Sequence, residues 1–209
     1  MHHKVARRRP NFNLAVKALL KDVARLEPFA HIKASRILVV AGEARRASRA
    51  TVKPLTFQDG KSIDPKTGLR RPVVRIKGRR MLYAITLRPL FFRGSSPKAR
   101  IGTLLHELFH VSRRFDGTLS ERRRHATMGD EFTRKLRPLV RRYLRHCPEE
   151  IRAAFSYDGD VRVQMWLERP GHFYLRGRDS SRRLYTEEQL FTGTVRMITR
   201  AKKRAATLQ

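Results

Sequence analysis

Acidic residues are scarce in this sequence of 209 residues: it has 18 aspartates and glutamates against 48 lysines and arginines, a formal net charge of +30. Such a balance excludes an acidic surface and favours binding to polyanions, of which nucleic acid is the commonest in a cell. Arginine outnumbers lysine 36 to 12, and an arginine-rich genome would produce the same bias without any partner. The charge therefore predicts non-specific nucleic-acid binding in vitro and leaves its biological role open.

Cysteine is nearly absent, because Cys147 is the single one. One cysteine excludes an intrachain disulfide and a four-cysteine zinc ribbon, and Cys147 is expected to be a small buried side chain. No apolar run approaches the ~20 residues of a membrane-spanning helix. The start, MHHKVARRRPNF, is basic and lacks the apolar stretch of a signal peptide. These absences predict a cytoplasmic protein with no membrane contact.

Apolar residues make up 40% of the composition, which is enough for a folded core. Helical spacing and capping residues predict four main helices, one of which Pro138 should kink or split. They cover residues 11–27, 97–113, 129–146 and 186–203. The last of them is predicted from a capping box, Thr186-Glu-Glu-Gln189.

Runs of β-branched and aromatic residues between turn residues predict the strands. These runs are RILVVAG (36–42), TVKPLTF (51–57), PVVRIK (72–77), MLYAITL (81–87), VRVQMWL (161–167) and HFYLRG (172–177). The third and fourth runs should form one hairpin, and the last two another. MLYAITL would suit a sheet edge that lines a substrate cleft. Helices and strands segregated in this way predict one α+β domain.

The stretch TLLHELFHVS (103–112) carries the strongest chemical signal. A helix turns about 100° per residue, so His106 and His110 point the same way, one turn apart. Two imidazoles at this spacing can bind one Zn²⁺, and Glu107 beside them can reach a metal-bound water. The alternative is an apolar helix that carries two unrelated histidines.

HELFH, the later FDGTL (115–119), a preceding MLYAITL and a downstream histidine resemble the SprT-like zinc metallopeptidases. They resemble still more closely the phage-type metallopeptidases of the HExxH class. The likeness covers roughly residues 12–145. It implies a zincin-like domain with an N-terminal helix, a small mixed β-sheet, the HExxH helix and a following helix. The expected organisation is a basic arm (1–9), this domain (10–147) and a C-terminal extension (148–209) with a hairpin and a basic helix packed on it.

The resemblance also implies a mechanism. One Zn²⁺ per chain, held by three protein ligands, leaves a position for water, and Glu107 takes the proton as that water attacks a peptide carbonyl. Glu107 then passes the proton to the leaving amine. Tyr83, Arg114 and Tyr143 are candidates for stabilising the oxyanion.

Three residues compete for the third ligand position. Asp116 has metzincin spacing, but that pattern needs a glycine where Arg113 stands. Glu131 lies where a gluzincin supplies a carboxylate. His125, 15 residues beyond His110, matches the third histidine of SprT-like proteins and is the leading prediction. In that family a Gly-x-x-Phe follows closely, whereas here Gly129 and Phe132 come three residues late.

The helix over 129–146 should carry a row of arginines opposite its apolar stripe. The row consists of Arg134, Arg137, Arg141 and Arg145. It is either a solvated face or a surface that binds nucleic-acid phosphates. Two functions are therefore expected: a zinc endopeptidase acting on peptides or on nucleic-acid-associated proteins, or a basic nucleic-acid-binding protein with a structural or vestigial metal site. The sequence does not predict an oligomeric state.

Overall fold

The computed structural model describes residues 9–42, 48–121, 129–171 and 184–199. Its α-helices are α1 (Phe12–Val23), α2 (Pro89–Phe92), α3 (Pro97–Phe109), α5 (Asp130–His146) and α6 (Glu149–Ser156). Its strands are β1 (Ile37–Ala41), β2 (Ala50–Pro54), β3 (Val73–Ile76), β4 (Arg79–Arg80), β5 (Tyr83–Leu87), β6 (Gly159–Trp166), β7 (Leu184–Tyr185) and β8 (Leu190–Met197). The predicted α+β class is confirmed.

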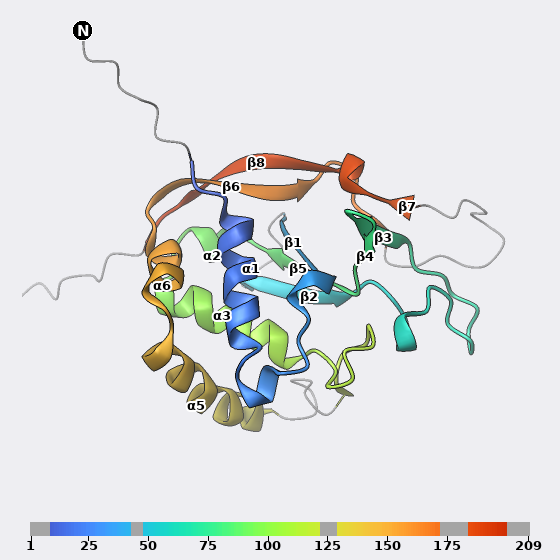
Figure 1. The fold of residues 1–209 in the computed structure, drawn as a ribbon, viewed down its shortest axis with the longest axis horizontal. Coiled ribbons are helices and arrows are strands. Elements are labelled where there is room, and N and C mark those ends of the chain that lie inside the picture. Colours follow the sequence, from blue (N-terminus) through green and yellow to red (C-terminus); the bar gives the residue numbers. More distant parts are fainter. Residues whose placement is uncertain (1–8, 43–47, 122–128, 172–183, 200–209) are drawn as a thin grey trace, which may run out of the picture.

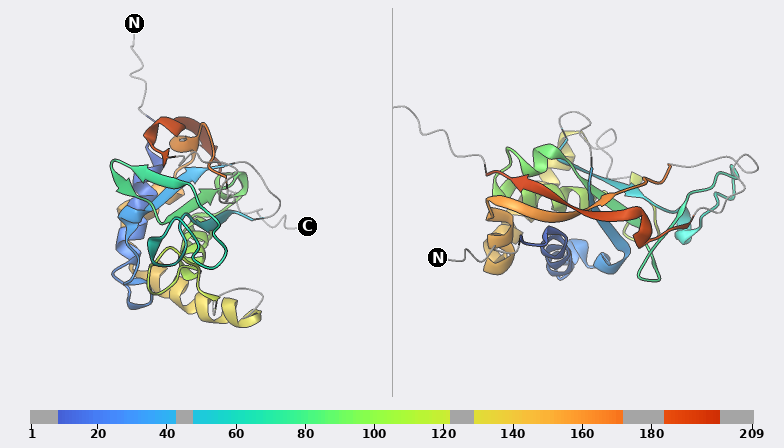
Figure 2. Two further views of the ribbon diagram at one scale, coloured as in Figure 1. Left: turned by 90° about the vertical axis from the view of Figure 1, so that its right-hand side faces the viewer. Right: turned by 90° about the horizontal axis from the view of Figure 1, so that it is seen from above.

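The strands form two mixed sheets (Figure 1). The larger has the order β2-β5-β1-β6-β8, in which β1 runs parallel to β5 and to β6, while β2 and β8 run antiparallel to their neighbours. The smaller has the order β4-β3-β7. Figure 1 and the right-hand view of Figure 2 place the small sheet and α6 at opposite ends of the molecule.

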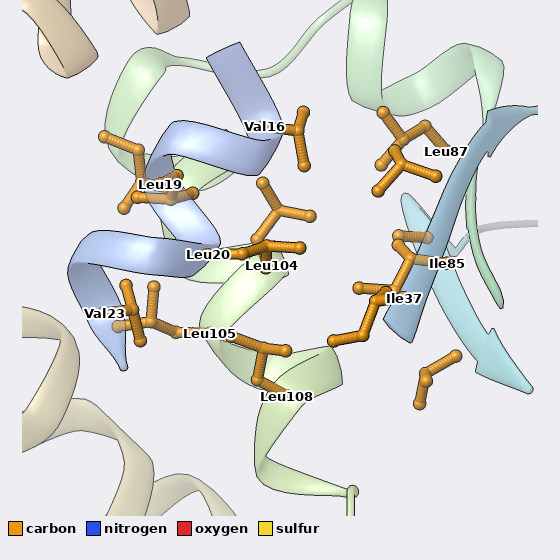
Figure 3. Close-up of a cluster of buried hydrophobic side chains, with 14 of the residues drawn as sticks. Val16, Leu19, Leu20, Val23, Ile37, Ile85, Leu87, Leu104, Leu105 and Leu108 are labelled. Atoms are coloured by element: carbon orange, nitrogen blue, oxygen red, sulfur yellow. The ribbon is translucent and has the colours of Figure 1, made fainter. Parts of the chain in front are cut away.

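The main core lies between one face of the large sheet and the helices. Asn11 caps α1 by accepting the N–H groups of Asn13 and Leu14. Figure 3 shows the packed side chains, which come from α1 (Val16, Leu19, Leu20, Val23), α3 (Leu104, Leu105, Leu108), β1 (Ile37) and β5 (Ile85, Leu87). All ten are fully buried. Each such side chain contributes ~1.5–3 kcal/mol to folding, so this cluster fixes α3 on the sheet.

The opposite face of the large sheet is covered in part by the small sheet. Residues alternate along a strand, so Leu38 and Val40 of β1 point away from the helices. They form a second core with Val74 of β3 and Tyr185 of β7. The large sheet therefore has a helical side and a side that faces the small sheet.

An asparagine from α1 joins the two halves of the large sheet. β1 and β6 pair at Ala41 and Met165, and Asn13 bridges the same strands further along. Its Nδ2 donates to the Val39 carbonyl at 2.6 Å, and its Oδ1 accepts from the Gln164 N–H at 2.6 Å. The amide thus replaces ladder hydrogen bonds where the strands diverge.

The predicted helix over 186–203 is wrong. Thr186 and Gln189 do form the expected capping box, but it opens one 3₁₀ turn (Glu187–Gln189), and β8 follows. Strand β8 pairs with β6 from Leu190 opposite Trp166 to Met197 opposite Gly159. This long-range ladder outweighs the local helix signal.

Two strand predictions also need correction. MLYAITL is not an edge strand, because β5 lies between β1 and β2, and β2 is the outer strand. It forms no hairpin with PVVRIK either; β3 turns back through Lys77 and Gly78 onto the two-residue β4. The antiparallel partner of β6 is β8, and the predicted strand HFYLRG lies outside the described residues.

Helix α5 runs without interruption through Pro138, so the predicted split does not occur. Pro138 is exposed, where water can solvate the carbonyl that a missing N–H leaves unpaired. Within the described part of the chain, no helix is both long and apolar enough to cross a membrane.

Candidate metal centre

Helix α3 presents the HELFH motif at its C-terminal end. Ser96 caps its start by accepting the Ala99 N–H at 3.2 Å, and Pro97 occupies the first helical position. The helix ends at Phe109, so His110 is its C-cap residue, still with right-handed helical angles. The apolar stripe of α3 faces the core and leaves His106 and His110 half-exposed.

The two histidine rings are adjacent and meet edge-on. Their Nε2 atoms lie 3.3 Å apart and their ring centroids 5.0 Å apart. Two nitrogens bound to one tetrahedral zinc at ~2.0–2.1 Å lie ~3.3 Å from each other. The separation thus fits a pair of zinc ligands, and it equally allows an N–H···N hydrogen bond between neutral rings. The donor set suits Zn²⁺ as well, because imidazole is one of its preferred ligands.

Glu107 is held on the core side of the same turn. Its side chain is 7% exposed, and its Oε2 accepts the backbone N–H of Val52 on β2 at 2.7 Å. Burial raises the pKa of the Glu107 carboxyl to about 7, although the Val52 N–H and the Arg88 guanidinium favour the charged form. A carboxyl with a pKa near neutrality can both accept and donate a proton.

Phe132 of α5 closes one side of the histidine pair. Its ring stacks on His110 at 4.7 Å between centroids and tilts against His106 at 4.8 Å. Phe132 is 1% exposed and also packs edge-on against Phe109 at 5.2 Å. The helix after the motif therefore restricts both imidazoles.

The FDGTL segment folds into a turn that returns the chain to the histidines. Gly117 has φ +90°, and a Cβ there would lie 1.7 Å from the Thr56 Oγ1 atom, so only glycine fits. Asp116 accepts the N–H and the hydroxyl of Thr118 through Oδ1. The chain then reaches Ser120, whose N–H donates to the His110 carbonyl at 2.8 Å.

The described residues contain no third ligand beside the pair. Among them, no group of three or more His, Cys, Asp or Glu side chains is placed to hold a metal ion. Asp116 is engaged in the turn just described, and Glu131 forms an ion pair with Lys135 at 2.8 Å on the surface of α5. Neither completes a set with the histidines. His125 lies outside the described residues.

Two of the three oxyanion candidates have structural partners. The Tyr83 hydroxyl donates to the Thr118 carbonyl at 2.9 Å and accepts the Gly117 N–H at 3.0 Å, so it supports the FDGTL turn. The Tyr143 hydroxyl donates to Asp22 at 2.9 Å. Burial raises the pKa of both phenols. Arg114 is exposed.

The surface of α5 agrees with its sequence pattern. Its four singled-out arginines, Arg134, Arg137, Arg141 and Arg145, are exposed, while Phe132, Leu136 and Tyr143 are buried. Cys147 is buried as expected, and burial raises the pKa of its thiol. Exposed guanidinium groups are a feature of a solvated face and of a polyanion-binding face alike.

Sequence reasoning missed two contributors to the site. The Val52 N–H reaches Glu107 from a strand 55 residues earlier, and a backbone group leaves no signal in the sequence. Arg88 acts on the Glu107 pKa from the end of β5. Phe132 belongs to the predicted apolar stripe of α5, but its contact with both histidines was not predicted.

Compared with protein-family models, curated proteins and solved structures, the chain matches none of them. A function must therefore be argued from the site.

Proposed function

We propose that this protein is a zinc-dependent metallopeptidase that hydrolyses peptide bonds with Glu107 as its general base and acid. The observation that carries the proposal is the pair of imidazole nitrogens, 3.3 Å apart, with a buried carboxyl on the same helical turn. A helix that merely carried two histidines would not need a buried glutamate, since burial of a carboxylate with one hydrogen bond and no ion pair to offset it is costly.

We infer that His106, His110 and His125 hold the metal. His125 follows Ser120 by five residues, and the Ser120 N–H is bonded to His110. Five residues span at most ~18 Å, so the chain can bring His125 to the pair. On its other side, α5 begins at Asp130 and places Phe132 on both imidazoles. Ser120 and Phe132, which lie before and after His125 in the sequence, therefore both contact the histidine pair.

Zinc held by these residues would supply two effects: it would polarise a peptide carbonyl and lower the pKa of a water molecule, so that the water can lose a proton and attack that carbonyl. Glu107 would take the proton from that water and transfer it to the leaving amine. The Val52 N–H fixes the Glu107 carboxyl through Oε2. In the metal-free protein burial raises the pKa of this carboxyl to about 7, which suits a group that both accepts and donates a proton.

The outer strand β2 offers a place for the peptide. It is the terminal strand of the large sheet, and Val52 on this strand contacts Glu107. An extended peptide can pair with the exposed edge of a sheet through backbone hydrogen bonds. A peptide added to β2 would run beside Glu107, which favours a peptide substrate over a compact small molecule.

The deciding experiment compares the zinc-loaded protein with its Glu107→Gln variant on a mixture of unfolded proteins. Glutamine keeps the shape and can still accept the Val52 N–H, so the fold and the bound zinc should survive. Loss of the general base should lower the rate by ~10²–10⁴-fold. Zinc content, circular dichroism and newly formed peptide N-termini are the measurements.

Glu149→Gln is the matched control, because Glu149 is exposed on α6 and forms a surface ion pair with Arg152 at 3.7 Å. It should cleave as fast as the unmodified protein. If Glu107→Gln cleaves equally well, the peptidase proposal is wrong. The rival, a basic nucleic-acid-binding protein with a structural metal, would then be favoured by the charge of +30.

A further inference from the structure

A positively charged cavity lies on the side of the large sheet opposite α3. It has a volume of about 440 Å³ and is lined by Lys53, Arg71, Arg88 and Arg169, together with Trp166. Among the described residues, no acidic side chain lines this cavity, and neither do His106, Glu107 and His110. We call it the cationic cavity. Strand alternation explains its position, because Lys53 on β2 and Val52 beside it point to opposite faces.

A second cavity of about 700 Å³ adjoins the first, and Thr86, Trp166 and Arg169 line both. Its other walls are mainly apolar and include Phe92, Leu167 and Phe191. Leu167 and Phe191 are exposed, at 73% and 45%. We call it the apolar cavity. A charged site and an apolar site thus meet at one aromatic residue.

The cationic cavity is partly preformed. The Arg71 guanidinium donates to the Thr56 carbonyl and lies over the Phe57 ring, 4.4 Å from its centroid. Arg88 donates to the Thr51 hydroxyl at 3.5 Å. Because four cationic side chains line this concave site, an anion bound in it would be attracted by all of them.

We propose that the cationic and apolar cavities together bind a single strand of nucleic acid. Its phosphates would lie at Lys53, Arg71, Arg88 and Arg169, and a base would contact Trp166 and the apolar wall. Binding of single strands without sequence preference combines these two elements, a basic groove and aromatic or apolar contacts to exposed bases. A duplex keeps its bases stacked inside and cannot present them to a cavity of this size.

Trp166 gives a direct test, because it is the single tryptophan in the sequence. The full-length, metal-free protein is titrated with a short single-stranded oligonucleotide, and fluorescence is excited where tyrosine does not absorb. The Trp166 emission should change in proportion to the strand bound, measured independently by anisotropy of a labelled oligonucleotide. Binding with unchanged Trp166 emission would place the strand elsewhere and overturn the proposal.

A charge-matched pair of variants tests the cations. Lys53→Gln with Arg169→Gln removes two charges from the cationic cavity, and Lys21→Gln with Arg25→Gln removes two exposed charges at the end of α1. Each phosphate contact to a single strand contributes ~0.7 to the slope of log K against log salt. The cavity variant should therefore flatten the slope by about 1.4 and lose affinity about 25-fold at 0.1 M salt. The α1 variant should change neither; equal losses in both variants would overturn the proposal.

Two other ligands complete the experiment. A nucleoside triphosphate that binds as tightly as the oligonucleotide would show that the cavities bind a single nucleotide and not a nucleic-acid strand. A polyglutamate peptide that binds equally well would show that any polyanion suffices. Either result overturns the proposal. Both measurements use protein without zinc and follow no hydrolysis, so their outcome is independent of the peptidase test.

Discussion

The two ends of α3 each bury a charged side chain, and their surroundings differ. Arg100, near the start, is 0% exposed and donates to four carbonyls: Phe91 at 3.1 Å, Phe92 at 2.9 Å, Phe155 at 2.8 Å and Ile198 at 3.0 Å. Glu107, two turns later, is 7% exposed and accepts one backbone N–H from Val52. Burial opposes both charges, since it lowers the pKa of Arg100 and raises that of Glu107.

The difference separates a structural charge from a reactive one. Arg100 connects the end of α2, the end of α6 and the residue after β8, so its donors are used within the protein. The surroundings of Glu107 place the pKa of its carboxyl near 7. Perturbed carboxyls of this kind are typical of functional sites, whereas fully bonded buried charges are typical of scaffolding.

The largest effect on stability is expected from Arg100→Met. It removes the donors while keeping most of the apolar volume, and leaves the Phe91 and Phe155 carbonyls without another donor among the described residues. Each buried unpaired carbonyl costs ~1–3 kcal/mol, so the free energy of unfolding should fall by ~3–5 kcal/mol. Urea denaturation gives the measurement.

Arg141→Met serves as the control, since Arg141 is exposed on α5, and it should change stability by less than ~0.5 kcal/mol. Glu107→Gln should likewise have a free energy of unfolding close to that of the unmodified protein. Should Glu107→Gln unfold the protein while Arg100→Met leaves it intact, the assignment of the two charges would have to be reversed.

Zinc affinity tests the C-terminal end of α3. His125→Ala should weaken zinc binding by more than ~100-fold, because loss of an outer-shell partner alone costs 10–100-fold. Glu131→Ala should have little effect, since that carboxylate is on the surface and paired with Lys135. Competition with a chelator measures both. The opposite order would assign the third ligand to Glu131 and reject the SprT-like arrangement.

A smaller effect is expected where the chain turns back after His110. Gly117→Ala and Gly94→Ala both place alanine at a positive φ, +90° and +93°, which costs ~1–3 kcal/mol in each. A Cβ at Gly94 would meet nothing within 4 Å, whereas at Gly117 it would overlap Thr56. Gly117→Ala should therefore be less stable than Gly94→Ala by ~1–2 kcal/mol. Equal unfolding midpoints would show that the turn can move away from Thr56.

Features encoded by local pattern could be predicted from the sequence. The periodicity of α1 and α3, the Ser96 cap and the i, i+4 histidines follow from a few neighbouring residues. Arg100 was missed, although it precedes Leu104 and Leu108 by four and eight residues and so lies on their buried stripe. A lone arginine on an apolar stripe predicts a buried guanidinium that donates hydrogen bonds within the protein.

Features that depend on distant partners could not be predicted. The segment after Thr186 has a real capping box, but its conformation is decided by pairing with β6. Asn13 bonds to Val39, 26 residues away, and to Gln164, 151 residues away. The Val52 N–H donates to Glu107, 55 residues away. Such contacts depend on the order of the strands, which no local pattern contains.

The smallest effect on the fold is expected from changing Arg134, Arg137, Arg141 and Arg145 together to Gln. In contrast to Arg100, all four are exposed, so stability should change by less than ~0.5 kcal/mol per site, and zinc content should be unchanged. Duplex DNA then distinguishes a solvated face from a binding face. If all four contact phosphates, the slope of log K against log salt should flatten by three to four units, about 0.9 per contact. An unchanged slope would show that the face is only solvated and that the charge of +30 acts through other parts of the surface.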